Sequence, residues 1–348
     1  MKIGILTFHD GINHGGFFQA FSTYGFLKNN GYDVEIINYK NRKHWLQEYK
    51  NFLCVKNPFV LISNLRKIIA FKKDQKKMNL GRFSLNTKSI KNTYDVIIVG
   101  SDIVWNYEWG FLGHDPVYFG HGLNSKKWIS YAPSFGSVSY SPKSIPAYVE
   151  SGLKKFSHIS VRDENSKEIV KMVSGRDSKI VLDPTFLLNT NGMENSIDIS
   201  EPYFLIYAYL LSDDDIKQAL DFARKRNLKV VAIGYKVAMA DVNIINVGPF
   251  DWLGYFSKAD YVLTSTFHGT LYSIKYKKNF IVSSNDNILN KTETILSKLG
   301  LRSKLSTGNL DFEDVYSEGI DYEHVNNVLD SLIEESKKYL IEAIESDY

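Results

Sequence analysis

One stretch of the sequence carries an unusual concentration of side chains suited to chemistry. The apolar run Tyr261–Leu263 leads into Thr-Ser-Thr-Phe-His-Gly-Thr, after which apolar residues at helical spacing resume. A helix that starts after such a turn presents backbone N–H groups, which favour anions. His268 lies within the turn, and Gly269 lets the backbone approach a ligand closely. The stretch therefore predicts a site for an anionic ligand.

A purely structural interpretation of this turn is also open. Ser265 or Thr266 can act as the N-cap of the following helix, and His268 can pack locally. If the anion interpretation holds, the groups expected to line the site are Ser265, Thr266, His268, Gly269 and Thr270. His268 can then serve either as a ligand of the anion or as a proton donor, since histidine changes charge near neutral pH.

Two more charged residues come directly after predicted strands. Asp102 follows the strand Tyr94–Val99, and Arg162 follows the strand Ser157–Val161. Ligands of open α/β sheets bind at the carboxyl ends of the strands. Asp102 can orient or deprotonate a hydroxyl there, or act only as an N-cap. The planar fork of Arg162 suits a carboxylate or phosphate, although a salt bridge to an acidic neighbour is the competing interpretation.

The composition narrows the class of protein. The 348 residues include 42 Lys or Arg and 39 Asp or Glu, and this net charge of +3 is too small to indicate nucleic-acid binding by itself. Cys54 is the only cysteine, which excludes an intrachain disulfide and a thiolate metal cluster. No apolar run approaches the roughly 18 residues of a membrane span, and no signal-peptide core follows Met1. A cytoplasmic location is expected.

Two further groups of residues have competing interpretations. His9, Asp10 and His14 lie close together in a glycine-rich turn, but such a turn is more typical of exposed or ligand-contacting residues than of a metal cage, so no metal site is expected. The basic segment Arg66–Arg82 is typical of a helical face that is exposed to solvent. Its alternative is peripheral contact with anionic lipid or a lipid-linked substrate, which would place the protein at the inner face of a membrane.

The elements that position these residues fall into two α/β halves. The first opens with the strand Lys2–Thr7, a helix and the strand Val34–Asn38, but Gly15-Gly16 does not form the glycine fingerprint of a dinucleotide site. The polar stretch Asn189–Glu201 marks a domain boundary, and a second βαβ pattern begins at Tyr203.

This pattern predicts an α/β fold of two Rossmann-like domains facing across a cleft, as in GT-B proteins, with C-terminal helices. The expected domains are 1–190, 200–320 and a helical segment 321–348. Active sites of such pairs lie between the halves, so Asp102, Arg162 and His268 are expected on facing edges.

Six segments in this order resemble the polysaccharide pyruvyl transferase family, and together they span nearly the whole chain. They are Asn13-His14-Gly15-Gly16 with Gln19-Ala20, Val99–Asn106, Tyr131–Gly136, Ser160–Glu164, Val181–Thr185 and Ser265–Thr270. Each is weak evidence alone, and the series is strong. Thr266 stands where a serine is usual and Ile103 where a glutamine is frequent, and the second departure bears on acceptor contacts.

The resemblance implies transfer of the pyruvyl group of phosphoenolpyruvate onto two hydroxyls of a sugar, which gives a cyclic ketal, in capsule, exopolysaccharide or cell-wall glycan synthesis. It implies that Arg162 and His268 contact the donor and that Ser101 and Asp102 belong to the site. No cofactor is implied, since phosphoenolpyruvate is a co-substrate. The first half is expected to contact a sugar, oligosaccharide or lipid-linked glycan through Asn13, His14, Gly15, Gln19, Ser101, Trp105 and Asn106.

Two alternatives stay open at this stage. A glycosyltransferase of the same architecture would use a nucleotide sugar, although no acidic ribose clamp follows His268. A glycan-binding protein without activity needs only the aromatic residues and the two domains, and it leaves the pair of Arg162 and His268 without a purpose.

Overall fold

The computed structural model describes residues 1–112, 114–139, 145–283, 286–308 and 310–346. The chain divides into two compact units. The first comprises Met1–Leu61, Gln75–Asn189 and Ser331–Tyr348, and the second comprises Ile62–Asp74 and Thr190–Asp330. The contiguous boundaries expected from the sequence differ from this division, because one segment near residue 70 groups with the second unit and the chain end groups with the first.

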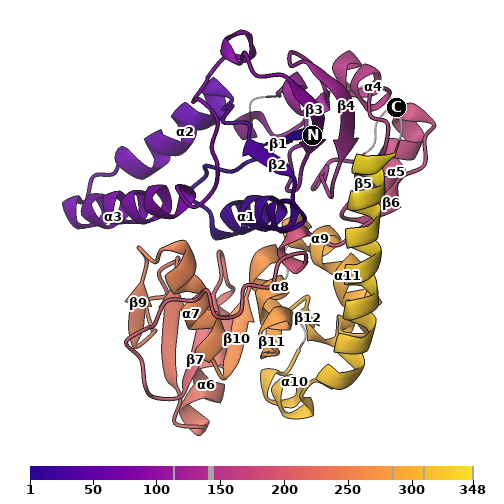
Figure 1. Cartoon of the computed structure of the whole chain (residues 1–348). Coiled ribbons are helices and arrows are strands. Elements are labelled where there is room, and N and C mark those ends of the chain that lie inside the picture. The colour runs from indigo at the N-terminus through magenta and orange to yellow at the C-terminus, as the bar shows by residue number, and fades with distance from the viewer. Residues whose placement is uncertain (113, 140–144, 284–285, 309, 347–348) are drawn as a thin grey trace. The chain divides into compact units, whose positions relative to one another are not determined.

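The first unit contains a four-stranded parallel sheet with the strand order β2-β1-β3-β4 (Figure 1). A short parallel pair, β5-β6, is connected to β4 through the bridge between Ile129 and His158. The elements are β1 (Lys2–Leu6), α1 (His14–Asn29), β2 (Asp33–Ile36), α2 (Arg42–Leu53), β3 (Tyr94–Val99), β4 (Ser125–Ser130), α4 (Ala147–Leu153), β5 (Ser160–Val161), α5 (Glu164–Ser174) and β6 (Lys179–Ile180).

The second unit contains a six-stranded parallel sheet with the strand order β12-β11-β10-β7-β8-β9 (Figure 1). Its elements are β7 (Tyr203–Tyr207), α6 (Asp213–Lys225), β8 (Lys229–Ile233), β9 (Val242–Ile244), α7 (Pro249–Lys258), β10 (Tyr261–Thr264), α8 (Phe267–Lys275), β11 (Asn279–Ser283), α9 (Asp286–Lys298), β12 (Leu305–Ser306) and α10 (Phe312–Glu318). Two long helices, α3 (Pro58–Gln75) and α11 (Tyr322–Glu345), each contribute residues to both units.

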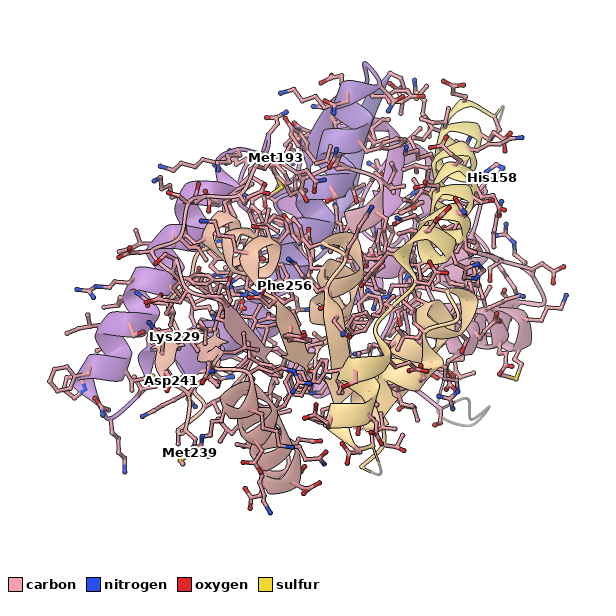
Figure 2. All side chains as sticks on the ribbon, turned by 90° about the horizontal axis from the view of Figure 1, so that it is seen from below. His158, Met193, Lys229, Met239, Asp241 and Phe256 are labelled. Atoms are coloured by element: carbon pink, nitrogen blue, oxygen red, sulfur yellow. The ribbon has the colours of Figure 1, made fainter. Side chains whose placement is uncertain are left out.

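The central strands form parallel sheets because both of their faces are apolar. All of β7 is buried, and in β3 the last four residues are buried, as parallel strands covered on both faces require. In the second unit, the carboxylate of Asp241 accepts a hydrogen bond from the backbone N–H of Val230, which follows Lys229 at the start of β8 (Figure 2). The side chain of Phe256, from α7, is fully buried. Since all strands of a sheet run the same way, their carboxyl ends meet at one edge of each sheet. Asp102, Arg162 and Ser265 follow the strands β3, β5 and β10 at such ends.

The end of the chain completes the first unit. From α11, Ser336 accepts a hydrogen bond from the backbone N–H of Leu182, and the ring of Tyr339 packs against that of Tyr131. Buried Lys127 of β4 donates to the hydroxyl of Ser346. Among the described residues, no helix is both long and apolar enough to cross a membrane.

Candidate active site

The β10–α8 connection is shorter than the sequence suggests. The strand ends at Thr264, and α8 already begins at Phe267, so His268 and Gly269 lie in the first turn of the helix instead of in the turn before it. Thr266 is the N-cap, and its hydroxyl accepts from the backbone N–H of Gly269 at 3.0 Å. Thr266 was one of the two expected caps. The helix starts early because this cap satisfies an N–H group of its first turn.

Gly269 is required by close packing at the start of α8. A Cβ at this position would lie 2.1 Å from Oγ1 of Thr264 and 2.6 Å from Oγ1 of Thr266. Thr264 donates to the carbonyl of Tyr207 at the end of β7, which holds its hydroxyl in place. The glycine therefore lets the helix begin directly against the hydroxyls that end the strand.

The remaining predicted donor-binding residues of this turn differ in how much surface they offer. Ser265 is buried. Its hydroxyl accepts from the backbone N–H of Tyr209 and donates to the backbone carbonyl of Tyr209, both at 2.6 Å. Thr270 is also buried and donates to the carbonyl of Thr266. His268 and Thr266 are partly exposed, and the ring of His268 packs edge-on against that of Phe267. Of this group, only His268 and Thr266 are partly exposed, and Nε2 of His268 is itself buried.

In the first unit, Gln19 connects the carboxyl ends of two strands. Its side-chain oxygen accepts from the backbone N–H of Ser101 and its side-chain nitrogen donates to Oγ1 of Thr7 and to the carbonyl of Gly16. The hydroxyl of Thr7, the first residue after β1, also lies within hydrogen-bonding distance of the carbonyl of Ser101. Gln19 is fully buried, so its observed role is to join α1, β1 and the loop after β3.

Ser101 and Asp102 adopt different positions in the loop after β3. Ser101 is buried, and its hydroxyl donates to the carbonyl of Ala132. Asp102 has a left-handed backbone with φ +69°, its Oδ1 accepts from the N–H of Ile103, and its side chain is partly exposed. A Cβ on Gly16 would lie 3.7 Å from Oδ2 of Asp102, so this carboxylate lies beside the first turn of α1.

Arg162 forms a buried ion pair at the same edge. Its NH1 donates to Oδ2 of Asp183 at 3.0 Å, and the two side chains are 3% and 1% exposed. The competing partners expected from the sequence were the neighbours Asp163 and Glu164. Asp163 instead caps α5 and accepts from the hydroxyl of Ser134. Because a buried charge is costly unless it is paired, the carboxylate of Asp183 compensates the buried charge of Arg162.

Asp183 and Thr7 were not predicted as site residues. Thr7 is the last residue of the predicted strand Lys2–Thr7 and follows β1 directly, and Asp183 lies three positions after β6. Ser101 also approaches Asp183, with Oγ 3.3 Å from Oδ2. The signal that identified Asp102, a polar residue at the carboxyl end of a buried strand, therefore applies equally to these two positions.

The start of α1 carries three of the expected acceptor contacts. Asn13 is the N-cap, its side chain accepts from the N–H of Gly16, and it is exposed. His14 and Gly15 follow as the first helical residues and are buried. Asn13 therefore offers side-chain surface at the helix start, whereas the next two positions contribute mainly to packing.

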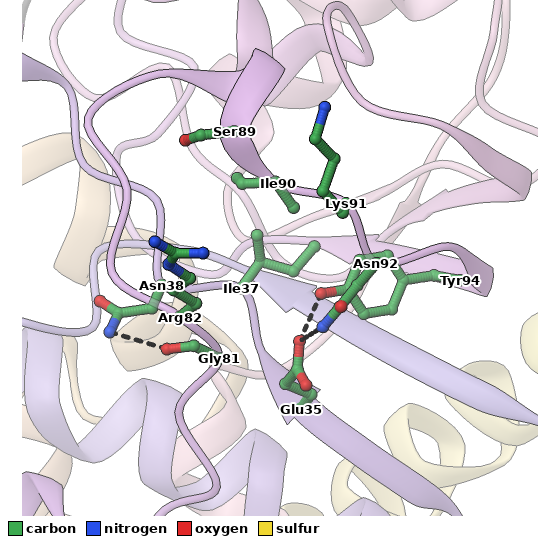
Figure 3. A pocket seen from close by; sticks show the side chains of 10 residues that line it. All are labelled: Glu35, Ile37, Asn38, Gly81, Arg82, Ser89, Ile90, Lys91, Asn92 and Tyr94. Carbon is green, nitrogen blue, oxygen red and sulfur yellow. Dashed lines mark hydrogen bonds between the residues drawn. The ribbon is translucent and has the colours of Figure 1, made fainter.

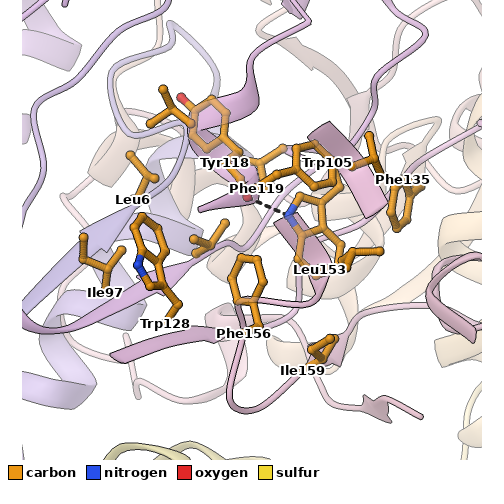
Figure 4. Close-up of a cluster of buried hydrophobic side chains, with 14 of the residues drawn as sticks. Leu6, Ile97, Trp105, Tyr118, Phe119, Trp128, Phe135, Leu153, Phe156 and Ile159 are labelled. Carbon is orange, nitrogen blue, oxygen red and sulfur yellow. Dashed lines mark hydrogen bonds between the residues drawn. The ribbon is translucent and has the colours of Figure 1, made fainter. Parts of the chain in front are cut away.

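The expectation of a sugar contact is wrong for Trp105, whose ring is fully buried in the core of the first unit. It packs against Phe119, Phe135 and Phe156, and its Nε1 donates to the carbonyl of Tyr118 (Figure 4). The large apolar ring and a satisfied N–H make it a core residue.

Asn106 also has a structural role. It is buried, and its side-chain oxygen accepts from the backbone N–H groups of Glu108 and Trp109. The amide therefore stabilises the turn after Trp105.

The glycine-rich loop after β1 is held by buried polar contacts. His9 lies with Nδ1 3.1 Å from the carbonyl of Thr7 and Nε2 3.1 Å from Oδ1 of Asn38, and burial lowers its pKa. Asp10 forms an ion pair with Lys40 at 2.5 Å. Within the described part of the chain, no three His, Cys, Asp or Glu side chains are grouped so that they could hold a metal ion.

A hollow of about 180 Å³ lies beside the end of β2 in the first unit. Glu35 lines it and accepts from the side-chain nitrogen of Asn92 and the hydroxyl of Tyr94, while the side-chain nitrogen of Asn38 donates to the carbonyl of Gly81 (Figure 3). None of the predicted site residues lines this hollow. Glu35, Asn92 and Tyr94 are thus engaged with one another, and the hollow is a feature of the sheet edge.

Comparison with known proteins gives the family. The sequence model named polysaccharide pyruvyl transferase matches residues 13–287, which is more than three quarters of the chain. The chain belongs to the polysaccharide pyruvyl transferase family. The match includes every residue predicted for the site, from Asn13 to Thr270. A search of curated proteins gives no significant match.

Solved structures show the fold class. UDP-GlcNAc 2-epimerase from Methanocaldococcus jannaschii, in complex with UDP-GlcNAc and UDP, has a TM-score of 0.52 at 11% identity, covering 98% of both chains. The Neisseria meningitidis UDP-GlcNAc 2-epimerase has a TM-score of 0.51 at 11% identity over 99% of both chains, and Arabidopsis thaliana UGT89C1 with UDP has 0.51 at 12% over 99% of both. At this identity the likeness establishes the fold alone. The predicted GT-B-like α/β fold of two Rossmann-like domains is confirmed.

Proposed function

We propose that this member of the family transfers the pyruvyl group of phosphoenolpyruvate to two hydroxyls of one sugar and forms a cyclic ketal. The observation that carries the proposal is the start of α8, where partly exposed His268 lies in the first turn behind the Thr266 cap. A helix start favours an anion such as phosphate or carboxylate, and histidine adds a group that can exchange a proton near neutral pH. The donor requires both properties.

The reaction begins at the double bond of the donor. Protonation of its terminal CH₂ carbon converts it to a methyl group and leaves an oxocarbenium-like centre on the carbon that bears phosphate. One sugar hydroxyl adds to this carbon and loses its proton. Phosphate then leaves, and the second hydroxyl closes the ring and releases its proton, so that phosphate and ketal are the products. The site must therefore supply an acid, a cradle for the anion and a base.

His268 is the proposed acid or phosphate ligand of this reaction. Its position in the first turn of α8 places the imidazole beside the positive end of the helix. Ser265 and Thr270 are engaged in backbone contacts, so their proposed contribution is to fix the helix start. Gly269 allows the backbone of α8 to start close to the end of the strand, and the hydroxyl of Thr266 caps the helix.

In the first unit, we assign Asp102 to the acceptor as the base or orienting group and Arg162 to the donor. Asp102 is partly exposed beside the first turn of α1, where Asn13 is also exposed. Arg162 is fixed by Asp183, which orients its guanidinium. The proposed acceptor is a sugar of a free, polymeric or lipid-linked glycan in cell-surface polysaccharide synthesis, used at the cytoplasmic side of the membrane.

The decisive test is product formation by the purified protein. Incubation with phosphoenolpyruvate and a panel of synthetic or lipid-linked hexosides is expected to release phosphate and to give a ketal that mass spectrometry detects. Thermal unfolding with phosphoenolpyruvate or a nucleotide sugar provides a second readout, because a ligand of the native state raises the unfolding temperature. Stabilisation by a UDP-sugar alone, together with transfer of that sugar, would instead establish a glycosyltransferase.

Substitution of His268 tests its role. His268→Ala is expected to lower kcat by about 10²–10⁴, because a general acid contributes this much, and a thermal unfolding curve of the variant checks that the partly buried side chain is not also needed for stability. His268→Asn keeps an N–H donor but cannot deliver a proton. A rate close to wild type in this second variant assigns a phosphate-binding role, and an equal loss in both assigns the acid. A wild-type rate in His268→Ala would exclude both roles.

A further inference from the structure

Helix α3 presents apolar side chains to solvent along one face. Phe59, Ile62, Leu65 and Ile69 recur at the spacing of a single helical stripe, and Phe59 is 80% and Ile69 66% exposed. Isolated exposed apolar residues are ordinary, but a continuous stripe of large ones is typical of an interaction surface.

Another face of the same helix is already anchored. Phe71 is fully buried, and Lys67 and Asp74 are also buried. These positions point away from the stripe, since they are separated from Ile69 and Leu65 by spacings that do not share a helical face. The apolar stripe is therefore a second apolar surface, beyond the one that holds α3 in the fold.

Basic side chains accompany the stripe. Arg66 and Lys73 lie on the same face, Lys76 follows the helix directly, and all three are exposed. Within the described residues, these three side chains form no ion pair. The only acidic residue of α3 is the buried Asp74. The stripe therefore combines an apolar half with a basic half and carries no negative charge.

The surrounding sequence concentrates the positive charge of the whole protein. Between Arg42 and Lys77 there are ten Lys or Arg and two acidic residues, although the complete chain has a net charge of only +3. The rest of the chain therefore has more acidic than basic side chains. Such asymmetry directs this segment towards an anionic surface.

We propose that α3 docks on an anionic lipid surface, with the stripe from Phe59 to Ile69 inserted among the lipids and the basic side chains at the headgroups. An amphipathic helix of this composition lies in the plane of the interface, and each basic residue near an anionic leaflet adds to binding. The docking is peripheral and independent of the proposed reaction.

A second copy of the chain fits the stripe less well than a lipid surface does. A two-fold interface places the same patch on both partners, so parallel stripes would bring Arg66 and Lys73 against their copies. Antiparallel stripes would set those charges over the apolar side chains of the partner, where they lose water without gaining an anion. Anionic lipid supplies both the apolar and the charged complement.

The test is co-sedimentation of the full-length protein with vesicles of phosphatidylcholine alone or with phosphatidylglycerol. Binding is expected only to the anionic vesicles and is expected to weaken as salt increases. Lys73→Gln/Lys76→Gln is expected to lower the partition coefficient roughly 25-fold, which corresponds to about fivefold for each charge near the surface. Ile62→Ser/Ile69→Ser should lower binding while the charge is unchanged.

Matched controls separate the stripe from general charge and apolarity. Lys217→Gln/Lys298→Gln removes two exposed lysines of the second unit, and Leu210→Ser/Met239→Ser removes two apolar side chains that are 73% and 60% exposed. Figure 2 labels Met239, which projects from the ribbon. Both controls are expected to bind like wild type. Equal loss in the controls, or no sedimentation of the wild type at low salt, overturns the proposal. A dimer that only the stripe variants dissociate, without vesicle binding, would identify a second copy as the occupant.

Discussion

In the first unit, the polar residues at the strand ends are bonded mainly to one another, whereas in the second unit the corresponding turn leaves His268 and Thr266 partly exposed. Gln19, Ser101, Asp183 and Arg162 are all buried, and their polar atoms meet in short contacts. The difference shows that residues of one family pattern divide into two kinds. Some build a rigid frame, which in the case of Asp183 also holds the proposed donor ligand Arg162, and others present a reactive group; sequence alone gives them equal weight.

Breaking the frame is expected to have the largest effect on stability. Arg162→Met leaves the carboxylate of Asp183 buried without this cation, which typically costs about 3–5 kcal/mol. Urea unfolding should show the loss. The double variant Arg162→Met/Asp183→Leu should recover much of the stability, because both charges are then absent. If the double variant recovers none of the lost stability, the unpaired carboxylate of Asp183 is not the cause of the loss in Arg162→Met.

A substitution at the reactive turn should affect both stability and activity. Gly269→Ala places a Cβ against Thr264, and overpacking of this kind costs about 1–3 kcal/mol. The start of α8 must then shift, so ketal formation is expected to fall together with the unfolding temperature. Adding Thr264→Ala removes the closest atom and is expected to restore part of both. A fully active and stable Gly269→Ala protein would show that the turn tolerates movement.

A buried cation in the second unit contrasts with Arg162. Burial lowers the pKa of Lys67 to about 8, from an ordinary value of 10.5, and no carboxylate contributes to that shift. Between these pH values the folded protein binds fewer protons than the unfolded chain, so stability rises with pH through this window. Below pH 8 the lysine must be charged while buried, which is unfavourable.

Lys67→Met is therefore expected to be stabilising at neutral pH. The gain should be about 1–3 kcal/mol at pH 7, consistent with the size of the pKa shift, and should shrink as the pH approaches 10. Urea unfolding of both proteins from pH 6 to pH 10 measures the difference. A difference independent of pH would mean that packing, and not charge, controls the effect.

The smallest effect is expected at the cap. Thr266→Ala removes the acceptor for the N–H of Gly269 and should cost about 1 kcal/mol, whereas Thr266→Ser keeps the hydroxyl and should be nearly neutral. Thermal unfolding of the two variants, compared at one protein concentration, measures this. Equal stability of Thr266→Ala and wild type would assign the cap to another group.

The sequence predicts the sheets well because their strands are apolar on both faces. The run Tyr94–Val99 is a strand with the predicted bounds, and β7 begins at Tyr203, where the second βαβ pattern is predicted to start. The carboxyl ends of these strands then place Asp102 correctly at the sheet edge. Periodicity and strand direction are local properties, so a single sequence contains them.

The positions that sequence reasoning misses depend on distant partners. Trp105 lies three positions after Asp102 in the loop that follows β3, and its burial depends on Phe119, Phe135 and Phe156, which lie elsewhere in the sequence. The choice of Thr266 over Ser265 as the cap depends on Tyr209, which engages the hydroxyl of Ser265. Asp183 pairs with Arg162 across 21 positions. No local pattern specifies such contacts.

The return of α11 to the first unit has a consequence for how the protein is made. Lys127 is buried, and the carbonyl and hydroxyl of Ser346 that it reaches are synthesised 219 positions later. Likewise, the backbone N–H of Leu182 can donate to the hydroxyl of Ser336 only after α11 has been synthesised. A nascent chain that ends at Asn189 therefore lacks these partners, and we expect it to stay sensitive to protease until α11 and Ser346 have been synthesised. Protection of a stalled 189-residue chain would show that the N-terminal part folds without its closing helix.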